Sequence, residues 1–393
     1  MDTTIDPTID RVIDTVALLR AQIPDLADAW IVGLDLRNFT TEWTAGQWAE
    51  LDVGGAAFAG CRLRPGDEER LRAAGATVLP AVDGFDVAPY RAALYGHDEL
   101  MAGYVPGHPE STLDARIGRR TQLPASPLER FARGVHDSCI DAALARFLEA
   151  SPGPVVGIMG SHATSRVDAA YRQVADLARD LTRAGFVVAT GGGPGLMEAA
   201  NLGAWLASAG AGALDEALEC LAAAPEYETD PAGYLERALE VRAAWPDGTT
   251  NLGVPTWIYV DEPLNQFSTH IAKYFQNSIR ENGLLAIALA GVVYTAGGSG
   301  TAQEIFTDAA QNDYTLYGIR SPMVFLGADH YERERPGLIA AVRDLAERGG
   351  WADLVRVVDS AGAALDAIRD LVHPMLGPAP EARAPRSLPL RKR

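Results

Sequence analysis

Two glycine-rich segments place small residues where a chemical site could form. Residues 191–195 read Gly-Gly-Gly-Pro-Gly, and residues 297–300 read Gly-Gly-Ser-Gly and are followed by Thr301. Each segment follows an apolar run that predicts a buried strand and precedes a predicted helix, and Gly160-Ser161 follows a third such run. A helix start offers unpaired N–H groups and a positive dipole end, and glycine lets the backbone approach a ligand closely. Although one such loop alone could be a tight turn, the three together predict a phosphate-bearing ligand.

The common dinucleotide and triphosphate signatures do not fit these loops. The GxGxxG pattern fails at both, because Leu196 and Gln303 stand where its last glycine is required. The second predicted strand ends in Thr190-Gly191 and not in an acidic residue that would bind a ribose diol. The sequence also contains no GxxxxGK[ST] motif. NAD and P-loop chemistry are therefore disfavoured, and no cofactor or metal site is predicted.

A polar stripe is predicted on a helix that we expect over residues 266–281. Its members are His270, Lys273, Asn277 and Arg280, whose spacing of three or four residues places them on one helical face. Such a stripe is ordinarily a solvated surface. This one contains the only lysine outside the C-terminal tail and no Glu–Lys pairs, which favours a face turned toward a ligand.

Glu304 is the carboxylate best placed for chemistry. It lies one turn into the helix predicted after residues 297–300, with Asp308 and Gln311 on the same face. A carboxylate so close to a bound anion is electrostatically costly unless it serves chemistry or a cation pairs with it. Arg280 is the natural partner. The alternative is an ordinary exposed helix glutamate.

The order of the predicted elements indicates an α/β fold. Apolar strands alternate with helices from Val155 onward, which predicts a Rossmann-like, doubly wound parallel sheet. Residues 1–150 are predicted to form an N-terminal α/β extension, residues 151–373 the Rossmann-like domain with a helical, acidic insertion at 208–250, and residues 374–393 a disordered tail. The strands predicted in the second domain cover residues 155–159, 186–190, 252–259, 291–295, 323–326 and 354–358.

Composition limits the classes of partner. The 393 residues carry a formal charge of −18, which argues against a nucleic-acid partner because phosphate backbones repel such a surface. The longest apolar run, Leu284 to Tyr294, is too short to cross a bilayer as a helix, and no secretory signal is evident. Cys61, Cys139 and Cys220 form no CxxC pair and are expected to be reduced. We expect a cytoplasmic protein with no membrane partner.

Both glycine motifs resemble those of a known family. Residues 191–198, GGGPGLME, and 297–304, GGSGTAQE, are similar to the paired GGGxxGLM and PGGxGTxxE motifs of the LOG (Lonely Guy) family, also labelled "lysine decarboxylase". The likeness covers Val155 to Leu371. Three features depart from the family pattern: Ala296 replaces the motif proline, Arg280 lies one residue further from its loop, and the 208–250 insertion is additional.

The resemblance implies a homodimeric Rossmann-like fold and a phosphoribohydrolase, which splits a nucleoside 5′-monophosphate into free base and ribose 5-phosphate. It implies Glu304 and Arg280 as the catalytic pair, with residues 297–301 holding the 5′-phosphate and Lys273 as an additional phosphate or ribose contact. The residues expected to bind the substrate are Gly160, Ser161, Gly191, Gly192, Gly193, Gly195, Met197, Lys273, Asn277, Gly297, Gly298, Ser299, Gly300 and Thr301.

Two other functions stay open at this point. The first is a nucleotide-binding sensor without turnover, which the loss of the motif proline at Ala296 would suit. The second is pyridoxal-phosphate-dependent decarboxylation, for which Lys273 is the only candidate Schiff-base lysine. No surrounding pattern supports this second alternative.

Overall fold

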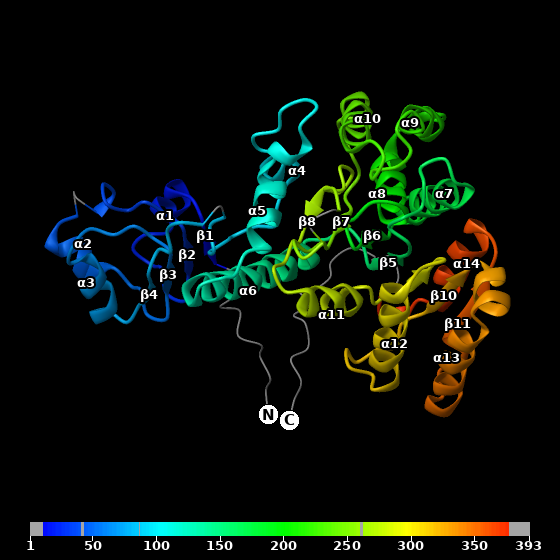
Figure 1. The fold of residues 1–393 in the computed structure, drawn as a ribbon. Helices are drawn as coiled ribbons and strands as arrows, with labels where there is room; N and C mark the ends of the chain where they lie inside the picture. Colours follow the sequence, from blue (N-terminus) through cyan, green and yellow to red (C-terminus); the bar gives the residue numbers. More distant parts are fainter. Residues whose placement is uncertain (1–10, 41–42, 86, 260–261, 377–393) are drawn as a thin grey trace. The chain divides into compact units, whose positions relative to one another are not determined.

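The computed structural model describes residues 11–376 except 41–42, 86 and 260–261 (Figure 1). The expected tail at 374–393 lies almost wholly outside this part. Contacts divide the chain into two compact units, one formed by residues 1–94 and 124–146 and the other by residues 95–123 and 147–393. The sequence predicted a single boundary near residue 150, whereas residues 95–123 group with the C-terminal unit.

The larger unit contains a seven-stranded parallel sheet of the predicted Rossmann-like type. Its strand order is β11-β10-β9-β5-β6-β7-β8, so the chain starts in the middle, winds to one edge and then returns to build the other half. The switch in winding direction falls between β5 and β9. The strands are β5 (Val155–Met159), β6 (Val187–Thr190), β7 (Leu252–Gly253), β8 (His270–Ile271), β9 (Val292–Tyr294), β10 (Met323–Leu326) and β11 (Val355–Val358).

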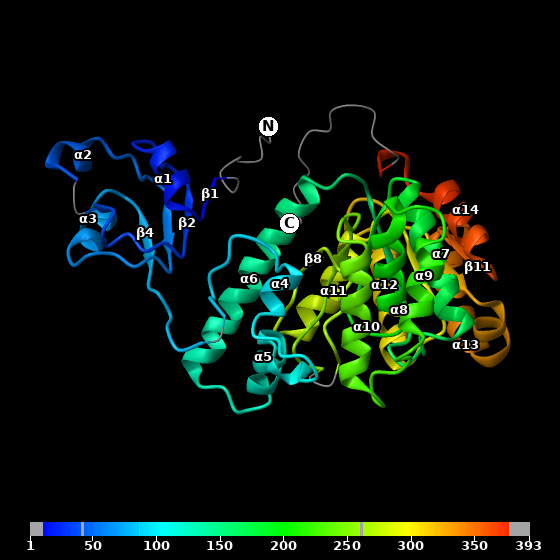
Figure 2. The ribbon, with the colours of Figure 1, turned by 90° about the horizontal axis from the view of Figure 1, so that it is seen from above.

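Helices cover both faces of this sheet (Figure 2). One face carries α7 (Ala169–Arg183), α8 (Leu196–Trp205) and α14 (Ala361–Leu371), which pack against one another. On the other face, α11 (Asn277–Ile287), α12 (Ser299–Asp313) and α13 (Pro336–Gly349) form a second contiguous layer. Strands buried on both faces need continuous apolar sequences, which explains why the sequence pattern located most of them.

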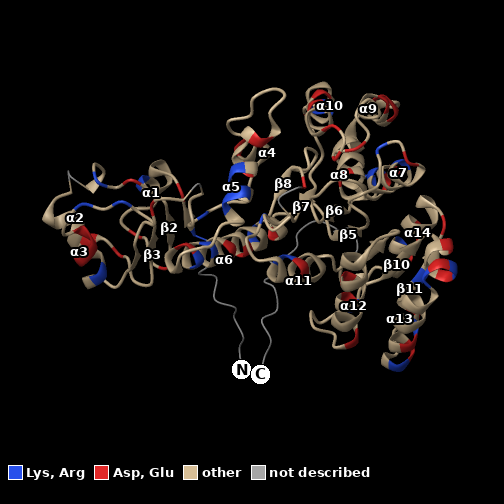
Figure 3. Ribbon diagram, viewed as in Figure 1, with Lys and Arg blue, Asp and Glu red and all other residues tan. Residues whose placement is uncertain are grey.

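The 208–250 insertion is helical, as predicted. It contains α9 (Ala213–Leu221) and α10 (Pro231–Ala244), and the acidic residues of α9 are visible in Figure 3. Tyr234 of α10 donates a 2.6 Å hydrogen bond to the buried Glu198 carboxylate of α8, which also forms an ion pair with Arg166 at 2.6 Å. The insertion is therefore attached through a satisfied buried charge pair to the helix that follows the first glycine loop.

The segment 252–276 differs from the prediction. The expected strand 252–259 is only the two residues of β7, and the helix predicted over residues 266–281 begins at Asn277. Residues 270–271 instead form the edge strand β8, where Ile271 pairs with Gly253 and also exchanges backbone hydrogen bonds with Tyr95. Because aromatic and β-branched residues are frequent in this segment, sheet pairing overrides the helical spacing of its polar residues.

Residues 95–123 explain that extended conformation. They contain α4 (His97–Leu100) and α5 (Leu113–Thr121). His97 bonds Gln266 at 2.6 Å, and Asp114 of α5 accepts a 2.8 Å hydrogen bond from the Trp257 indole. Segments distant in sequence thus hold the 252–276 region.

The smaller unit is built on a four-stranded parallel sheet of order β1-β2-β3-β4. Ile31, Phe58 and Val78, on β2, β3 and β4, belong to a core shared with Leu19 and Leu71 on the covering helices. The elements are β1 (Val12–Ile13), α1 (Val16–Gln22), β2 (Trp30–Val32), α2 (Ala45–Glu50), β3 (Ala57–Ala59), α3 (Asp67–Ala73), β4 (Thr77–Leu79) and α6 (Pro127–Glu149), the last reaching residue 146 within this unit.

None of the helices in the described ranges is both long and apolar enough to span a bilayer.

The contact between α7 and α8 gives a test of the fold. A Cβ added at Gly203 of α8 would overlap the Ala175 carbonyl oxygen of α7, whereas one at Gly283 of α11 would meet open space. We expect Gly203→Ala to lower the free energy of unfolding by about 3 kcal/mol, and Gly283→Ala to raise it by about 1 kcal/mol. Urea denaturation of both variants measures this difference, and equal effects would contradict the close helix packing.

Candidate functional site

The three predicted loops come together at the carboxyl edge of the sheet. They follow β5, β6 and β9, which are neighbours in the sheet and flank its switch point. The Leu196 amide donates to the Ser161 carbonyl at 3.0 Å, and the Ser161 amide donates to the Ala296 carbonyl at 3.3 Å. A Cβ at Gly195 would lie 2.5 Å from the Ser161 carbonyl oxygen, so this glycine permits the contact. The switch point of such a sheet is where ligands bind.

A buried amide network, which the sequence pattern did not predict, fixes the first glycine loop. Asn201 of α8 accepts hydrogen bonds from Thr190 at 2.6 Å and Asn265 at 2.9 Å, and donates to Asn251 at 2.8 Å. The Thr190 hydroxyl in turn accepts from the Gly192 amide at 3.0 Å. Polar residues at fully buried positions of α8 and β6 were the available signal, but their partners lie far along the chain.

Arg280 projects from the first turn of α11 into this loop. Its Nε donates to the Val254 carbonyl at 2.7 Å, which fixes the guanidinium after β7. A Cβ at Gly191 would overlap that guanidinium. Gly191 is therefore required to leave room for a side chain as well as to keep the backbone accessible.

Glu304 faces Arg280 from α12. Its Oε1 lies 3.9 Å from Arg280 Nη1, and the two side chains are 14% and 10% exposed. Burial raises the pKa of Glu304 from 4.5 to about 7, while the Arg280 charge acts to lower it and Glu281 to raise it. The structure thus brings together the two residues predicted as a pair, at a distance that leaves each able to contact a ligand.

The start of α12 is open. Its N-cap residue, Gly298, has no side chain to cover the first amides, and Ser299 and Gly300 are exposed. Thr301 is buried, and its hydroxyl lies so close to Gly297 that a Cβ there would overlap it. Exposed amides at the start of a 15-residue helix suit an anion.

The predicted polar helix face is not formed. His270 lies on β8 and Lys273 in the loop after it, and only Asn277 and Arg280 are on α11. Lys273 is buried, with its Nζ 2.7 Å from Asp114 Oδ1. Lys273 is thus part of an ion pair that attaches α5 to the loop after β8.

Asn277 and Met197 lie beside the loop residues. Asn277 Nδ2 donates to Glu281 at 2.6 Å and to the Tyr259 hydroxyl at 3.3 Å. Met197 packs over the first glycine loop, because its Sδ and Cε would lie 2.7 and 2.8 Å from Cβ atoms at Gly191 and Gly193. Both contribute to the walls around Arg280.

A cavity of about 340 Å³ in the same unit opens next to the first loop. Glu262 connects the two, because its Oε2 would lie 2.9 Å from a Cβ at Gly193. Burial raises the pKa of Glu262, whereas the charges of His162, Arg280 and Lys273 act to lower it. Trp257 and Lys273 form part of the far wall. No group of three or more His, Cys, Asp or Glu side chains suited to a metal ion occurs within the described ranges.

Fold and site together define a Rossmann-like α/β protein with its candidate ligand site at the switch point. No protein-family model and no curated protein matches the sequence.

Solved structures match part of the fold. The molybdenum cofactor carrier protein MCP from Chlamydomonas reinhardtii aligns with 56% of this chain and 97% of its own, at 19% identity and a TM-score of 0.34. The molybdenum cofactor binding protein from Rippkaea orientalis aligns with 56% of this chain and 96% of its own, at 15% identity and a TM-score of 0.34. At these identities and scores the similarity concerns the fold, and no functional argument rests on it.

The raised pKa of Glu304 predicts that the stability of the protein depends on pH. Because its pKa is about 7 in the folded protein against an ordinary 4.5, the folded state retains a proton that the unfolded chain releases between these values. Stability is therefore lost as the pH rises from 4.5 to 7, by on the order of 3 kcal/mol. Glu304→Gln removes this loss.

We expect Glu304→Gln to be more stable than the wild type at pH 8 and equally stable near pH 4.5, as measured by urea denaturation. The control is Glu347→Gln, which changes an exposed glutamate of α13 and should leave the pH profile unaltered. If the free energy of unfolding of the wild type and of Glu304→Gln changed with pH in the same way, Glu304 would be shown to be solvated.

Proposed function

We propose that this protein hydrolyses the N-glycosidic bond of nucleoside 5′-monophosphates, giving free base and ribose 5-phosphate, and that it belongs to the LOG-like proteins its motifs resemble. The observation that carries the proposal is the Glu304–Arg280 pair at 3.9 Å, between the open start of α12 and the first glycine loop. A homodimer, which the resemblance implies, is part of the proposal.

The 5′-phosphate is assigned to the start of α12. The amides of Ser299, Gly300 and Thr301 lie in the first turn, where the dipole favours an anion. Gly297 and Gly298 let the phosphate approach the backbone. The ribose then extends toward Glu304 and Arg280, one turn deeper.

Glu304 is assigned to the reacting carbon. Water adds to C1′ of the ribose, the C1′–N bond breaks, and the base leaves with the bonding electrons and takes up a proton. The ionised carboxylate stabilises the positive charge that develops on the sugar and accepts the proton of the attacking water, as carboxylates do in O-glycosidases. A pKa of about 7 suits a base that works near neutral pH. Arg280 orients the carboxylate and the ribose hydroxyls.

The base is assigned to the side of the first glycine loop. Gly160, Ser161 and residues 191–195 form the near wall, and the cavity beyond Glu262 gives a purine or pyrimidine ring room to enter. Glu262, at the boundary between the loop and the cavity, can form hydrogen bonds with polar ring atoms.

Base release from nucleoside monophosphates tests the proposal. We expect wild type to release free base, detected by chromatography, and Glu304→Gln to lower kcat at least 100-fold because the carboxylate is lost. Glu347→Gln on α13 is the matched control and should retain activity. Equal base release by wild type and Glu304→Gln would refute the role of Glu304. Tight binding of a nucleotide that is recovered unchanged would instead establish the sensor alternative.

The pH dependence of kcat/KM tests which charges act on Glu304. Because the carboxylate is the active form, activity should rise with pH through about 7. Glu281 raises the pKa of Glu304, so Glu281→Gln should move this rise to lower pH, whereas loss of Arg280 should move it to higher pH. An unmoved profile in Glu281→Gln would show that another group limits the reaction.

A further inference from the structure

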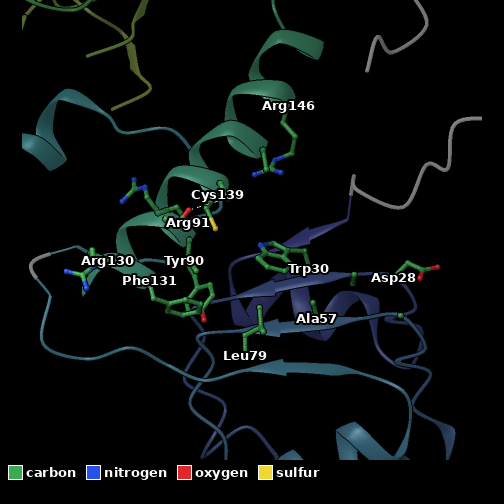
Figure 4. Close-up of a pocket in the computed structure, with 16 residues that line it drawn as sticks. Asp28, Trp30, Ala57, Leu79, Tyr90, Arg91, Arg130, Phe131, Cys139 and Arg146 are labelled. Carbon is green, nitrogen blue, oxygen red and sulfur yellow. Dashed lines mark hydrogen bonds between the residues drawn. The ribbon is translucent and has the colours of Figure 1, made fainter. Parts of the chain in front are cut away.

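The smaller unit contains a cavity that the proposed reaction does not use. It has a volume of about 640 Å³, within the range of small-molecule sites, and lies between one face of the four-stranded sheet and α6 (Figure 4). All of its lining residues belong to this unit.

Small side chains on both walls create the cavity. On the sheet, Ala57 of β3 is paired with Trp30 of β2 in register, so a short side chain stands beside a large one. On α6, Gly134, Ser138 and Ala142 are spaced by four residues and line the cavity together. Two residues further along the same strands, Val32 of β2 and Ala59 of β3 pack with Cys139 of α6, and no space is left there. The space is therefore confined to one part of the sheet face.

Tyr90 supplies a polar group to the lining of the cavity. Its side chain is 5% exposed and lines the cavity, and its ring packs on Gly60, where a Cβ would lie 2.5 Å away. Its hydroxyl has no hydrogen bond to any described residue. Burial raises the pKa of the Tyr90 phenol, which therefore remains a donor. The hydroxyl is therefore available to donate to a ligand.

The charges around the cavity are mainly positive. Arg91, Arg130 and Arg146 line it together with a single carboxylate, Asp28. Arg130 donates to the Ala125 carbonyl at 2.6 Å and forms no ion pair within the described ranges. A guanidinium that makes no ion pair in the described part of the chain, beside an apolar space, favours an anionic ligand.

Aromatic side chains form the rest of the lining. Trp30 and Phe131 border the cavity with Tyr90 (Figure 4), and Phe131 is 55% exposed. Burying such a ring against a ligand is favourable, and aromatic rings prefer offset or edge contacts with other rings.

We propose that this cavity binds a small aromatic anion, with its ring between Trp30, Phe131 and the Ala57 floor and its anionic group held by Arg130 at the mouth.

Calorimetric titration of the full-length protein tests this site with naphthalene-2-carboxylate, and with naphthalene-2-carboxamide as the matched neutral probe. We expect the carboxylate to bind at least tenfold more tightly. 2-Naphthyl phosphate distinguishes a preference for phosphate from one for carboxylate. Ribose 5-phosphate should not displace the carboxylate, because it is directed to the other unit; displacement would place the probe in the switch-point site and overturn the proposal.

Variants locate the probe. Ala57→Leu fills the floor and should weaken carboxylate binding more than tenfold, and Arg130→Gln should weaken it about five- to tenfold while leaving carboxamide binding unchanged. The control is Arg62→Gln, which removes an exposed arginine paired with Asp83 outside the cavity and should bind as wild type. Thermal denaturation checks that each variant is folded. Equal binding of the two naphthalene probes, or unchanged binding in Arg130→Gln, would refute the proposal.

Discussion

The electrostatic balance at Glu304 is the constraint on which the site depends. Burial acts against the ionised carboxylate, and the Arg280 guanidinium acts in its favour. Arg280 can do so because the Val254 carbonyl orients it and because Gly191 leaves space for it. Gly191 in turn follows a strand whose loop is fixed by Thr190 and the Asn201 network. A glycine in the loop after β6 thus influences the ionisation of a carboxylate on α12, the helix that follows β9.

This dependence explains which parts of the site could be inferred from the sequence. Strands buried on both faces are continuous apolar runs, and glycine loops between strand and helix are local patterns, so β5, β6 and β9 and their loops were predictable. The pairing of Glu304 with Arg280 also followed, because both flank the same predicted strand. These features depend on neighbours close in sequence or on the geometry common to parallel sheets.

The 266–276 segment could not be inferred in the same way. Its polar residues have helical spacing, yet β8 forms because Ile271 pairs with Gly253 on one side and with Tyr95 on the other. The same long-range attachment explains Lys273. Its isolation among arginines suggested a ligand contact, whereas its partner is Asp114 of α5. Residues 95–123 carried no motif, so nothing local indicated that they complete the larger unit.

Small residues have opposite effects in the two units, depending on what surrounds them. At Gly191 and Gly203 the space left by the missing side chain is filled by Arg280 and by the backbone of α7, so these glycines serve packing. At Ala57 and along Gly134, Ser138 and Ala142 the space stays open. An apolar surface left open in this way forgoes the stabilisation that a larger side chain at Ala57 would supply. A ligand that fills the cavity buries this apolar surface instead. Its binding free energy then includes the stabilisation that the protein's own side chains do not supply.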